Sequence, residues 1–261
     1  MNTVLTFDHE LTKRVEALYR TRDAIERRGA VMASLGLKTG EQVLDIGTGF
    51  GFMAAEMADY VGPNGQIHGI DLSESMLGMA RERCADKPWV TFRSGDALTL
   101  PVADASFDVA VSVQVYELVA DVAKALSEMH RVLRPGGRGV IVSTDWEAIA
   151  WQASDQERMK RVLDTFVMSR VPALPRTLAW RLRETGFVVK EQRIIAQFNP
   201  AYEPDAYSYQ LIHFIETSLS GRDGIAPEEV EAWKADLRGM GERGEYFFSL
   251  NCYLHGVVKP R

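Results

Sequence analysis

A short apolar strand that runs directly into three alternating glycines constrains this chain most. Residues 43–51 read VLDIGTGFG, and the helix-compatible residues 52–58 that follow read FMAAEMA. Glycine allows tight turns and lets a ligand approach the backbone closely, because it carries no Cβ atom. A strand, a glycine turn and a helix in this order predict a nucleotide-type ligand site at a βα junction.

Strands and helices alternate along the chain. The apolar, β-branched runs predict strands at Gln42–Ile46, Gln66–Asp71, Val90–Ser94, Phe107–Val113, Arg138–Ser143, Val188–Gln197 and Tyr246–Val258. Helical periodicity predicts helices at Glu10–Leu35, Phe52–Ala58, Ser73–Asp86, Val119–Leu133, Gln156–Phe166, Thr177–Thr185, Ala206–Leu219 and Pro227–Met240. Residues 134–137, with the sequence RPGG, are expected to form a turn between a helix and a strand. Short apolar strands between helices predict a parallel sheet covered on both faces.

Composition excludes several classes of function. The formal net charge of −6 draws the chain neither to nucleic acid nor to an anionic membrane. Two cysteines, Cys84 and Cys252, cannot build a disulfide framework or a thiolate metal site, so we expect no metal. The first ten residues lack a basic region before an apolar core, and no apolar run reaches about 18 residues. We therefore expect no signal peptide, no membrane span and a cytoplasmic location.

Two classes of ligand use a glycine turn after the first strand. The dinucleotide fingerprint G-x-G-x-x-G requires a small residue at the position that Phe52 occupies. The spacing here is G-x-G-x-G, which suits a ligand whose amino-acid part lies against the turn. Asp45 matches the ammonium group of such a ligand by charge, and it would repel a pyrophosphate. The turn therefore favours a ligand with an amino-acid part over a dinucleotide.

Acidic residues follow the next two strands. Asp71 can accept hydrogen bonds from two ribose hydroxyls and excludes a 2′-phosphate, although NAD sites use the same device. Asp96 can accept from an adenine amine, and an aspartate at such a junction also serves turn chemistry alone. Neither residue separates the two ligand classes by itself.

In combination, these segments resemble class I S-adenosylmethionine-dependent methyltransferases. The resemblance runs from about Leu35 to Asp145 and rests on residues 44–51, 69–71, 95–97, 107–109 and 131–137. It implies an α/β, Rossmann-like, doubly wound sheet of seven strands with the last strand antiparallel, for which Tyr246–Val258 is well placed. The segments are most similar to the small-molecule branch that includes quinone and natural-product methyltransferases.

The resemblance implies S-adenosyl-L-methionine as the cofactor and S-adenosyl-L-homocysteine as its product. It places the three glycines against the methionyl part, Asp71 on the ribose, Asp96 and Ala97 at the adenine, and Gln114 beside the sulfonium. It also implies that the helix carrying Tyr19 closes over the cofactor. The complete predicted cofactor set is Tyr19, Asp45, Gly47, Thr48, Gly49, Gly51, Asp71, Leu72, Met76, Asp96, Ala97 and Gln114.

A single domain of three parts is expected. These parts are an N-terminal helical cap at 1–35, a cofactor-binding core at 36–145, and a substrate-side half at 146–261. The third part contains a helical insert at about 200–242.

Methyl transfer by in-line displacement requires a base only when the acceptor must lose a proton. The candidate bases are Tyr116, Glu117, Asp145 and His213, and a structural histidine is the alternative for His213. Aromatic residues gather after residue 145 and predict an apolar pocket, although core packing explains many of them. The predicted substrate residues are Trp146, Tyr209, His213, Tyr246 and Asn251.

We therefore expect a methyltransferase that acts on a small, largely apolar or aromatic molecule at carbon, oxygen or nitrogen. Residues 113–116 read VQVY rather than the Asn-Pro-Pro-Tyr pattern of enzymes that methylate nucleic-acid amino groups, so no nucleic-acid partner is expected. One alternative is a homologue that binds the cofactor as a scaffold or for a non-methylating reaction. The other is an NAD-linked oxidoreductase, which Asp45 and Phe52 disfavour. A monomer or a homodimer is expected.

Overall fold

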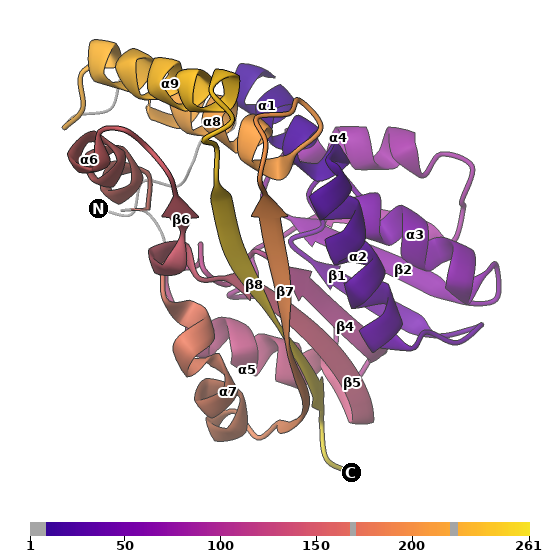
Figure 1. The fold of residues 1–261 in the computed structure, drawn as a ribbon. Helices are drawn as coiled ribbons and strands as arrows, with labels where there is room; N and C mark the ends of the chain where they lie inside the picture. Colours follow the sequence, from indigo (N-terminus) through magenta and orange to yellow (C-terminus); the bar gives the residue numbers. More distant parts are fainter. Residues whose placement is uncertain (1–8, 168–170, 220–223) are drawn as a thin grey trace. The chain divides into compact units, whose positions relative to one another are not determined.

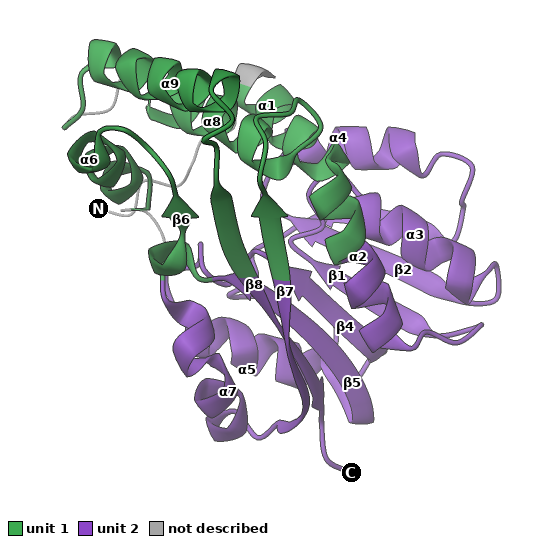
Figure 2. Cartoon of the chain, viewed as in Figure 1, with its two compact units in different colours: residues 1–27, 145–172, 196–251 green, residues 28–144, 173–195, 252–261 purple. Residues whose placement is uncertain are grey.

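The computed structural model describes residues 9–167, 171–219 and 224–261. The chain forms two compact units, each assembled from three separate segments (Figure 2). Unit 1 comprises Met1–Arg27, Asp145–Pro172 and Ala196–Asn251, and unit 2 comprises Arg28–Thr144, Ala173–Ile195 and Cys252–Arg261. Residues 1–8, on which the expected absence of a signal peptide depends, lie outside the described residues.

A single mixed sheet organises the fold (Figure 1). Within the described residues it has eight strands in the order β3-β2-β1-β4-β5-β8-β6, and β7 also pairs with β8. The strands are β1 (Gln42–Ile46), β2 (Gln66–Asp71), β3 (Val90–Ser94), β4 (Phe107–Val113), β5 (Leu133–Thr144), β6 (Ala150–Trp151), β7 (Val188–Asn199) and β8 (Phe248–Val258). Strands β1 to β5 pair in parallel, and β8 runs antiparallel to β5. The predicted Rossmann-like sheet is confirmed, with the two-residue β6 added to the seven expected strands.

The helices lie between these strands in chain order. They are α1 (His9–Arg20), α2 (Arg22–Leu35), α3 (Phe52–Val61), α4 (Glu74–Arg83), α5 (Val122–Val132), α6 (Gln156–Val167), α7 (Leu174–Glu184), α8 (Tyr207–Leu219) and α9 (Pro227–Glu242), with a short 3₁₀ helix at Trp146–Ala148. Ser73 caps α4 as predicted, because its side chain accepts a hydrogen bond from the backbone N–H of Met76. Among the described residues, no helix has the length and apolar character needed to cross a membrane.

The core of unit 2 lies between the sheet and two helices on one of its faces. Val31 on α2 and Met57 on α3 pack against Val109, Val140 and Val142 of the central strands. Successive side chains of a strand point to opposite faces, so Gly139 belongs to the other face. Met129 of α5 lies over Gly139, which places α5 on that second face. Helices therefore cover both faces, as the apolar strands predict.

The predicted N-terminal helix is two helices. The pattern predicts one helix over Glu10–Leu35, but α1 ends at Arg20 and α2 begins at Arg22. The hydroxyl of Thr21 donates to the carbonyl of Leu18 at 2.8 Å and accepts from the N–H of Ala24 at 3.4 Å. A threonine side chain that bonds local backbone groups competes with the helical ladder, which explains the break.

Residues 134–137 are part of a strand rather than a separate turn. Strand β5 begins at Leu133, and its register with β4 shifts between the pairs Phe107–Leu133 and Val109–Arg138. The N–H of Gly136 donates to the carbonyl of Lys259, and the N–H of Lys259 donates to Gly137. Pairing with the distant residue Lys259 therefore holds this glycine pair in the sheet.

Unit 1 is mostly helical and rich in aromatic contacts. Helix α1 packs against α8, and α6 packs against α8 and α9. The ring of Phe166 lies 5.5 Å from that of Trp146 and 5.6 Å from that of Phe214, both edge-to-face. Such ring pairs stabilise a core in addition to the stabilisation that comes from the apolar area they bury.

Candidate functional site

The carboxyl ends of the parallel strands meet at one edge of the sheet in unit 2. Strand β1 leads into Gly47, β2 ends at Asp71, β4 leads into Gln114 and β5 ends at Thr144. The strand order reverses between β1 and β4, which pair directly. Open α/β sheets bind ligands at such a reversal, in the crevice beyond the carboxyl ends of the strands. The fold therefore brings the predicted glycine turn and Gln114 to the edge of the sheet at which this rule expects a ligand crevice.

Gly47 packs directly against the loop that follows β4. Its φ of +73° is in the left-handed region, and a Cβ atom added here would lie 2.2 Å from Cγ2 of Val115. A larger residue cannot fit without displacing Val115. The protein's own packing therefore requires glycine at this position.

Gly49 differs because open space lies beside it. Its φ is +52°, and the nearest atom to an added Cβ is Sδ of Met76 at 4.0 Å. Its N–H donates to Oδ2 of Asp71 at 2.9 Å. Of these two glycines, Gly49 is the one at which a ligand can approach the backbone.

Asp71 links the glycine turn to the start of α4. Its Oδ1 accepts from the N–H of Ser73 at 2.9 Å, in addition to the Oδ2 bond with Gly49. Burial raises the pKa of Asp71, and these backbone N–H groups oppose the rise. Each carboxylate oxygen keeps a further acceptor position. The neighbouring Leu72 is exposed, and Met76 is buried.

Asp45 lies inside the protein beneath the turn. Its carboxyl group is 2% exposed, and Oδ2 accepts a hydrogen bond from the Thr48 hydroxyl at 2.7 Å. Burial raises the pKa of Asp45 to about 7; the Thr48 bond opposes the rise, and the nearby Asp71 charge adds to it. Asp45 thus supports the turn through Thr48. Its predicted contact with a ligand ammonium stays a prediction.

Asp96 participates in a tight turn after β3. Its Oδ1 accepts from the N–H of Leu98 at 2.9 Å, and Asp96 forms an isolated bridge with Thr99. These are the contacts that the turn-chemistry alternative expects. Ala97 next to it is buried. A role of either residue at an adenine stays a prediction.

The loop after β4 begins with a strained residue. Gln114 has a φ of +57°, and its N–H donates to the carbonyl of Val142 at 2.8 Å. Its side-chain Nε2 donates to the hydroxyl of Thr144 at 2.7 Å. The backbone N–H of Thr144 donates to Oε1 of the buried Glu117 at 3.3 Å. Two predicted site residues, Gln114 and Glu117, therefore share Thr144, which sequence reasoning missed.

Tyr116, a candidate base, is fully buried in the same loop. Burial raises the pKa of its phenol above the ordinary value of 10. The phenol therefore stays protonated at neutral pH and is not available as a general base.

Phe52, which separates the two ligand classes in the sequence, lies between two cations. The guanidinium of Arg83 is 3.7 Å from its ring centroid and that of Arg28 is 5.0 Å away. Arg83 also donates to the backbone carbonyl of Phe50. Cation–π contacts therefore fix the end of the glycine turn, and no local sequence signal pointed to these arginines.

The predicted substrate residues all belong to unit 1. The ring of Tyr209 lies 4.9 Å from that of His213 and 4.9 Å from that of Tyr202, which in turn lies 5.6 Å from Tyr246. The hydroxyl of Tyr246 accepts a hydrogen bond from the indole of Trp151 at 3.1 Å. These five residues, here named the aromatic row, bring three predicted positions together.

The remaining unit 1 candidates are placed separately from the aromatic row. Trp146 is buried, and the carbonyl of Asn251 accepts from the N–H of Asp145 at 3.2 Å. Tyr19 lies on α1, with the buried guanidinium of Arg27 6.0 Å from its ring. His213 is in unit 1, whereas Tyr116 and Glu117 are in unit 2.

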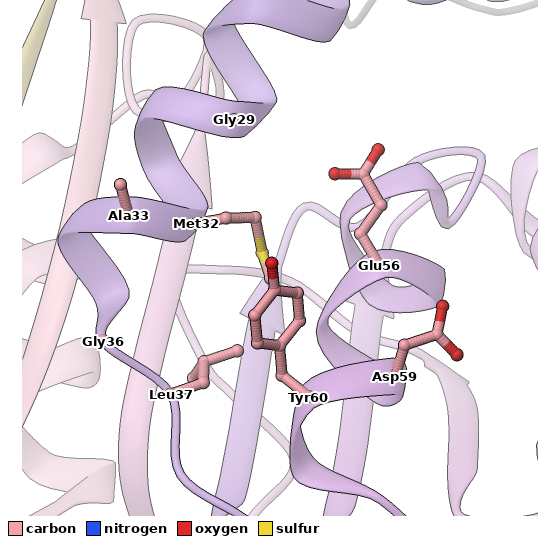
Figure 3. A pocket seen from close by; sticks show the side chains of 8 residues that line it. All are labelled: Gly29, Met32, Ala33, Gly36, Leu37, Glu56, Asp59 and Tyr60. Atoms are coloured by element: carbon pink, nitrogen blue, oxygen red, sulfur yellow. The ribbon is translucent and has the colours of Figure 1, made fainter.

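A cavity of about 540 Å³ in unit 2 lies away from the strand ends. Figure 3 shows Tyr60 close to Met32 and Leu37, with Glu56 and Asp59 on the same helix as Tyr60. The α3 residues in this lining lie in the last two turns of the helix, whereas the glycine turn precedes its first residue. The cavity is therefore at the opposite end of α3 from the glycine turn. Among the described residues, no group of three or more His, Cys, Asp or Glu side chains is arranged to hold a metal ion.

Comparisons with known proteins agree on one family. A family model for a methyltransferase domain matches residues 44–141. The chain is 36% identical over 179 residues to an uncharacterised protein in transposon TN4556 of Streptomyces fradiae. The aligned residues are 67% of this chain and 51% of that protein. It is 39% identical over 117 residues to demethylmenaquinone methyltransferase of Staphylococcus aureus, covering 45% and 48% of the two chains. The chain thus spans about half the length of the curated relatives that it matches.

Solved structures share the fold. A putative methyltransferase from Bacillus halodurans aligns with a TM-score of 0.65 at 20% identity, covering 90% of this chain and all of that one (100%). Phosphoethanolamine N-methyltransferase 2 of Haemonchus contortus, solved with S-adenosyl-L-methionine, aligns at 0.62 and 23% identity, covering 96% and 57%. The cyclase SpnF aligns at 0.61 and 21% identity, covering 91% and 81%. Residues 44–141 therefore belong to a family of methyltransferase domains, and the chain shares the fold of solved methyltransferases.

Proposed function

We propose that this protein transfers a methyl group from S-adenosyl-L-methionine to a small, largely apolar or aromatic molecule. The observation that carries the proposal is the crevice of unit 2, where Gly49 faces open space and donates its N–H to Asp71. A backbone that can be approached closely and a carboxylate with acceptor positions to spare suit a nucleoside with an amino-acid tail.

Each residue of the crevice has a role in this proposal. The cofactor supplies a methyl group on a sulfonium, and the protein supplies binding and orientation. The backbone at Gly49 lies against the amino-acid part, and Gly47 supports the turn through its contact with Val115. Asp71 accepts from the ribose hydroxyls. Gln114, which directly follows β4, is assigned to the sulfonium, as the resemblance implies. Holding the acceptor atom and the methyl carbon in line contributes several kcal/mol of the barrier reduction.

The aromatic row supports an apolar or aromatic acceptor. Burial raises the pKa values of Tyr202 and Tyr246, so both phenols stay neutral, and their rings supply apolar surface. The curated relative demethylmenaquinone methyltransferase is named for a quinone acceptor, whereas the structural neighbour phosphoethanolamine N-methyltransferase 2 is named for a polar one. Within the proposal, Glu117, Asp145 and His213 remain the candidate bases, since the raised pKa of Tyr116 keeps its phenol protonated.

A second candidate is a non-methylating reaction on the same fold. It is motivated by the structural likeness to the cyclase SpnF. In that case the protein binds the cofactor without transferring its methyl group. The aromatic row then holds a substrate in position for another reaction.

A labelled-methyl assay distinguishes the two candidates. The full chain is incubated with S-adenosyl-L-methionine carrying a deuterated methyl group and a panel of quinols, phenols and aliphatic amines. We expect one acceptor class to gain the label, with no label transferred by Asp71→Ala and full transfer by Asp86→Ala, a matched change of an exposed aspartate. Cofactor binding without label in any acceptor would reject methyl transfer and leave the second candidate.

A further inference from the structure

Thr144 is the point at which the last parallel strand contacts the loop after β4. It is fully buried at the carboxyl end of β5. Its hydroxyl accepts from Nε2 of Gln114 at 2.7 Å and lies 3.4 Å from Sγ of Cys252. Its backbone N–H donates to Glu117. One residue therefore binds both ends of the segment 114–117.

The segment that Thr144 holds is strained and packs on the glycine turn. Among the described residues, Ala105 and Gln114 are the two non-glycine residues with a left-handed φ. Such a conformation persists only where surrounding contacts impose it, and it concentrates at functional sites. The next residue, Val115, fills the space beside Gly47 that a Cβ atom would occupy. The position of the glycine turn thus depends on the path of residues 114 and 115.

We propose that Thr144 is a positioning residue for the cofactor, a role that rests on the proposed function of the crevice. The hydroxyl of Thr144 holds the Gln114 side chain and with it the left-handed turn at the end of β4. That turn sets Val115 against Gly47 and so fixes the distance between the glycine turn and Gln114. The hydroxyl of Thr144 acts through Gln114.

Calorimetric titration with S-adenosyl-L-homocysteine tests this role. Thr144→Val keeps the shape of the side chain and removes the hydroxyl, so we expect binding to weaken about three- to tenfold, as for one lost hydrogen bond. Thr144→Ser retains the hydroxyl and is expected to bind within about twofold of the wild type. In a Gln114→Ala background, Thr144→Val should cause no further loss, because both changes remove the same contact.

Ser143→Ala is the matched control. Ser143 precedes Thr144, is equally buried, and its hydroxyl makes no hydrogen bond to any described residue. Deleting this hydroxyl should leave the affinity unchanged, and circular dichroism at the titration temperature confirms that each variant is folded. The inference is overturned if Thr144→Val binds as tightly as the wild type, or if it weakens binding equally in the Gln114→Ala background. Absence of binding by the wild type would overturn the proposed function itself.

Discussion

The two units hold their predicted site residues in different ways. In unit 2, Gly47, Asp71 and Gln114 follow or end neighbouring parallel strands, and backbone hydrogen bonds fix them. In unit 1, Trp151, Tyr202 and Tyr246 come from distant parts of the chain and are held by ring contacts and one hydrogen bond. The strand-end edge of unit 2 is therefore encoded in short sequence motifs, whereas the aromatic row depends on packing between distant segments.

The largest expected effect is at Gly47, where backbone and packing both require glycine. Gly47→Ala should lower the free energy of unfolding by roughly 2–5 kcal/mol, from the left-handed backbone and the clash with Val115. Gly49 has a similar φ but open space beside it. Gly49→Ala should therefore lower the free energy of unfolding by only about 1–2 kcal/mol, and it should weaken the binding of S-adenosyl-L-homocysteine. Urea unfolding measures both losses. Equal destabilisation by the two changes would contradict the distinction between the two glycines.

The buried carboxyl of Asp45 predicts a pH dependence of unit 2. Its folded pKa of about 7 lies above the ordinary 3.8, so the folded state binds more protons between these values. The contribution of Asp45 to stability is therefore complete below about pH 4 and is lost as the pH rises towards 7, by at most about 1.4 kcal/mol per pH unit.

Urea unfolding at several pH values checks this dependence. Asp45→Asn should flatten the decline in stability between about pH 4 and pH 7, and the exposed Asp86→Asn should leave it unchanged. Parallel pH profiles for the wild type and Asp45→Asn would show that the carboxyl group is ionised within the fold.

A smaller effect is expected in the aromatic row of unit 1. Tyr246→Phe removes the acceptor for the buried indole N–H of Trp151 and should cost about 1–3 kcal/mol of stability. The same change at the exposed Tyr60 should cost almost nothing. Because the row belongs to unit 1, the affinity for S-adenosyl-L-homocysteine should stay the same. A tenfold loss of that affinity would contradict the assignment of cofactor binding to unit 2 alone.

The smallest effect is expected at His213. Its Nδ1 lies 3.4 Å from Glu216 in a partly exposed pair, and such pairs contribute about 0.5 kcal/mol or less. His213→Gln should therefore unfold at nearly the wild-type urea concentration. If it also reduces label transfer to the acceptor, the histidine acts in the reaction. A stability loss above about 1 kcal/mol would instead favour the structural alternative.

The sequence predicts the bounds of the central strands closely and the bounds of the helices and of β5 less closely. The observed bounds of β1, β2, β3 and β4 match the expected ranges, because apolar runs end there at glycine or polar residues. The helix before β5 begins at Val122 rather than Val119, and the Asp121 cap was a signal that could have located this start. The break at Thr21 and the inclusion of residues 134–137 in β5 depend on hydrogen bonds that periodicity does not encode.

The same division applies to the candidate site. The glycine turn and Asp71 are local motifs, so their place in the crevice could be predicted. Thr144 and Val115 make contacts with residues that are distant in the sequence: Thr144 bonds Gln114, 30 residues away, and Val115 packs on Gly47. The expected adjacency of β4 and β5 could have pointed to Thr144. The hydrogen bond between Trp151 and Tyr246, 95 residues apart, had no comparable signal.

Calorimetric titration of S-adenosyl-L-homocysteine into the wild type and Asp71→Ala tests the central claim most directly. We predict one binding site per chain in the wild type and at least about a tenfold loss in the variant, because hydrogen bonds to a charged carboxylate are stronger than neutral ones. Unchanged binding by Asp71→Ala, or no heat from the wild type, would contradict the assignment of the unit 2 crevice as the cofactor site.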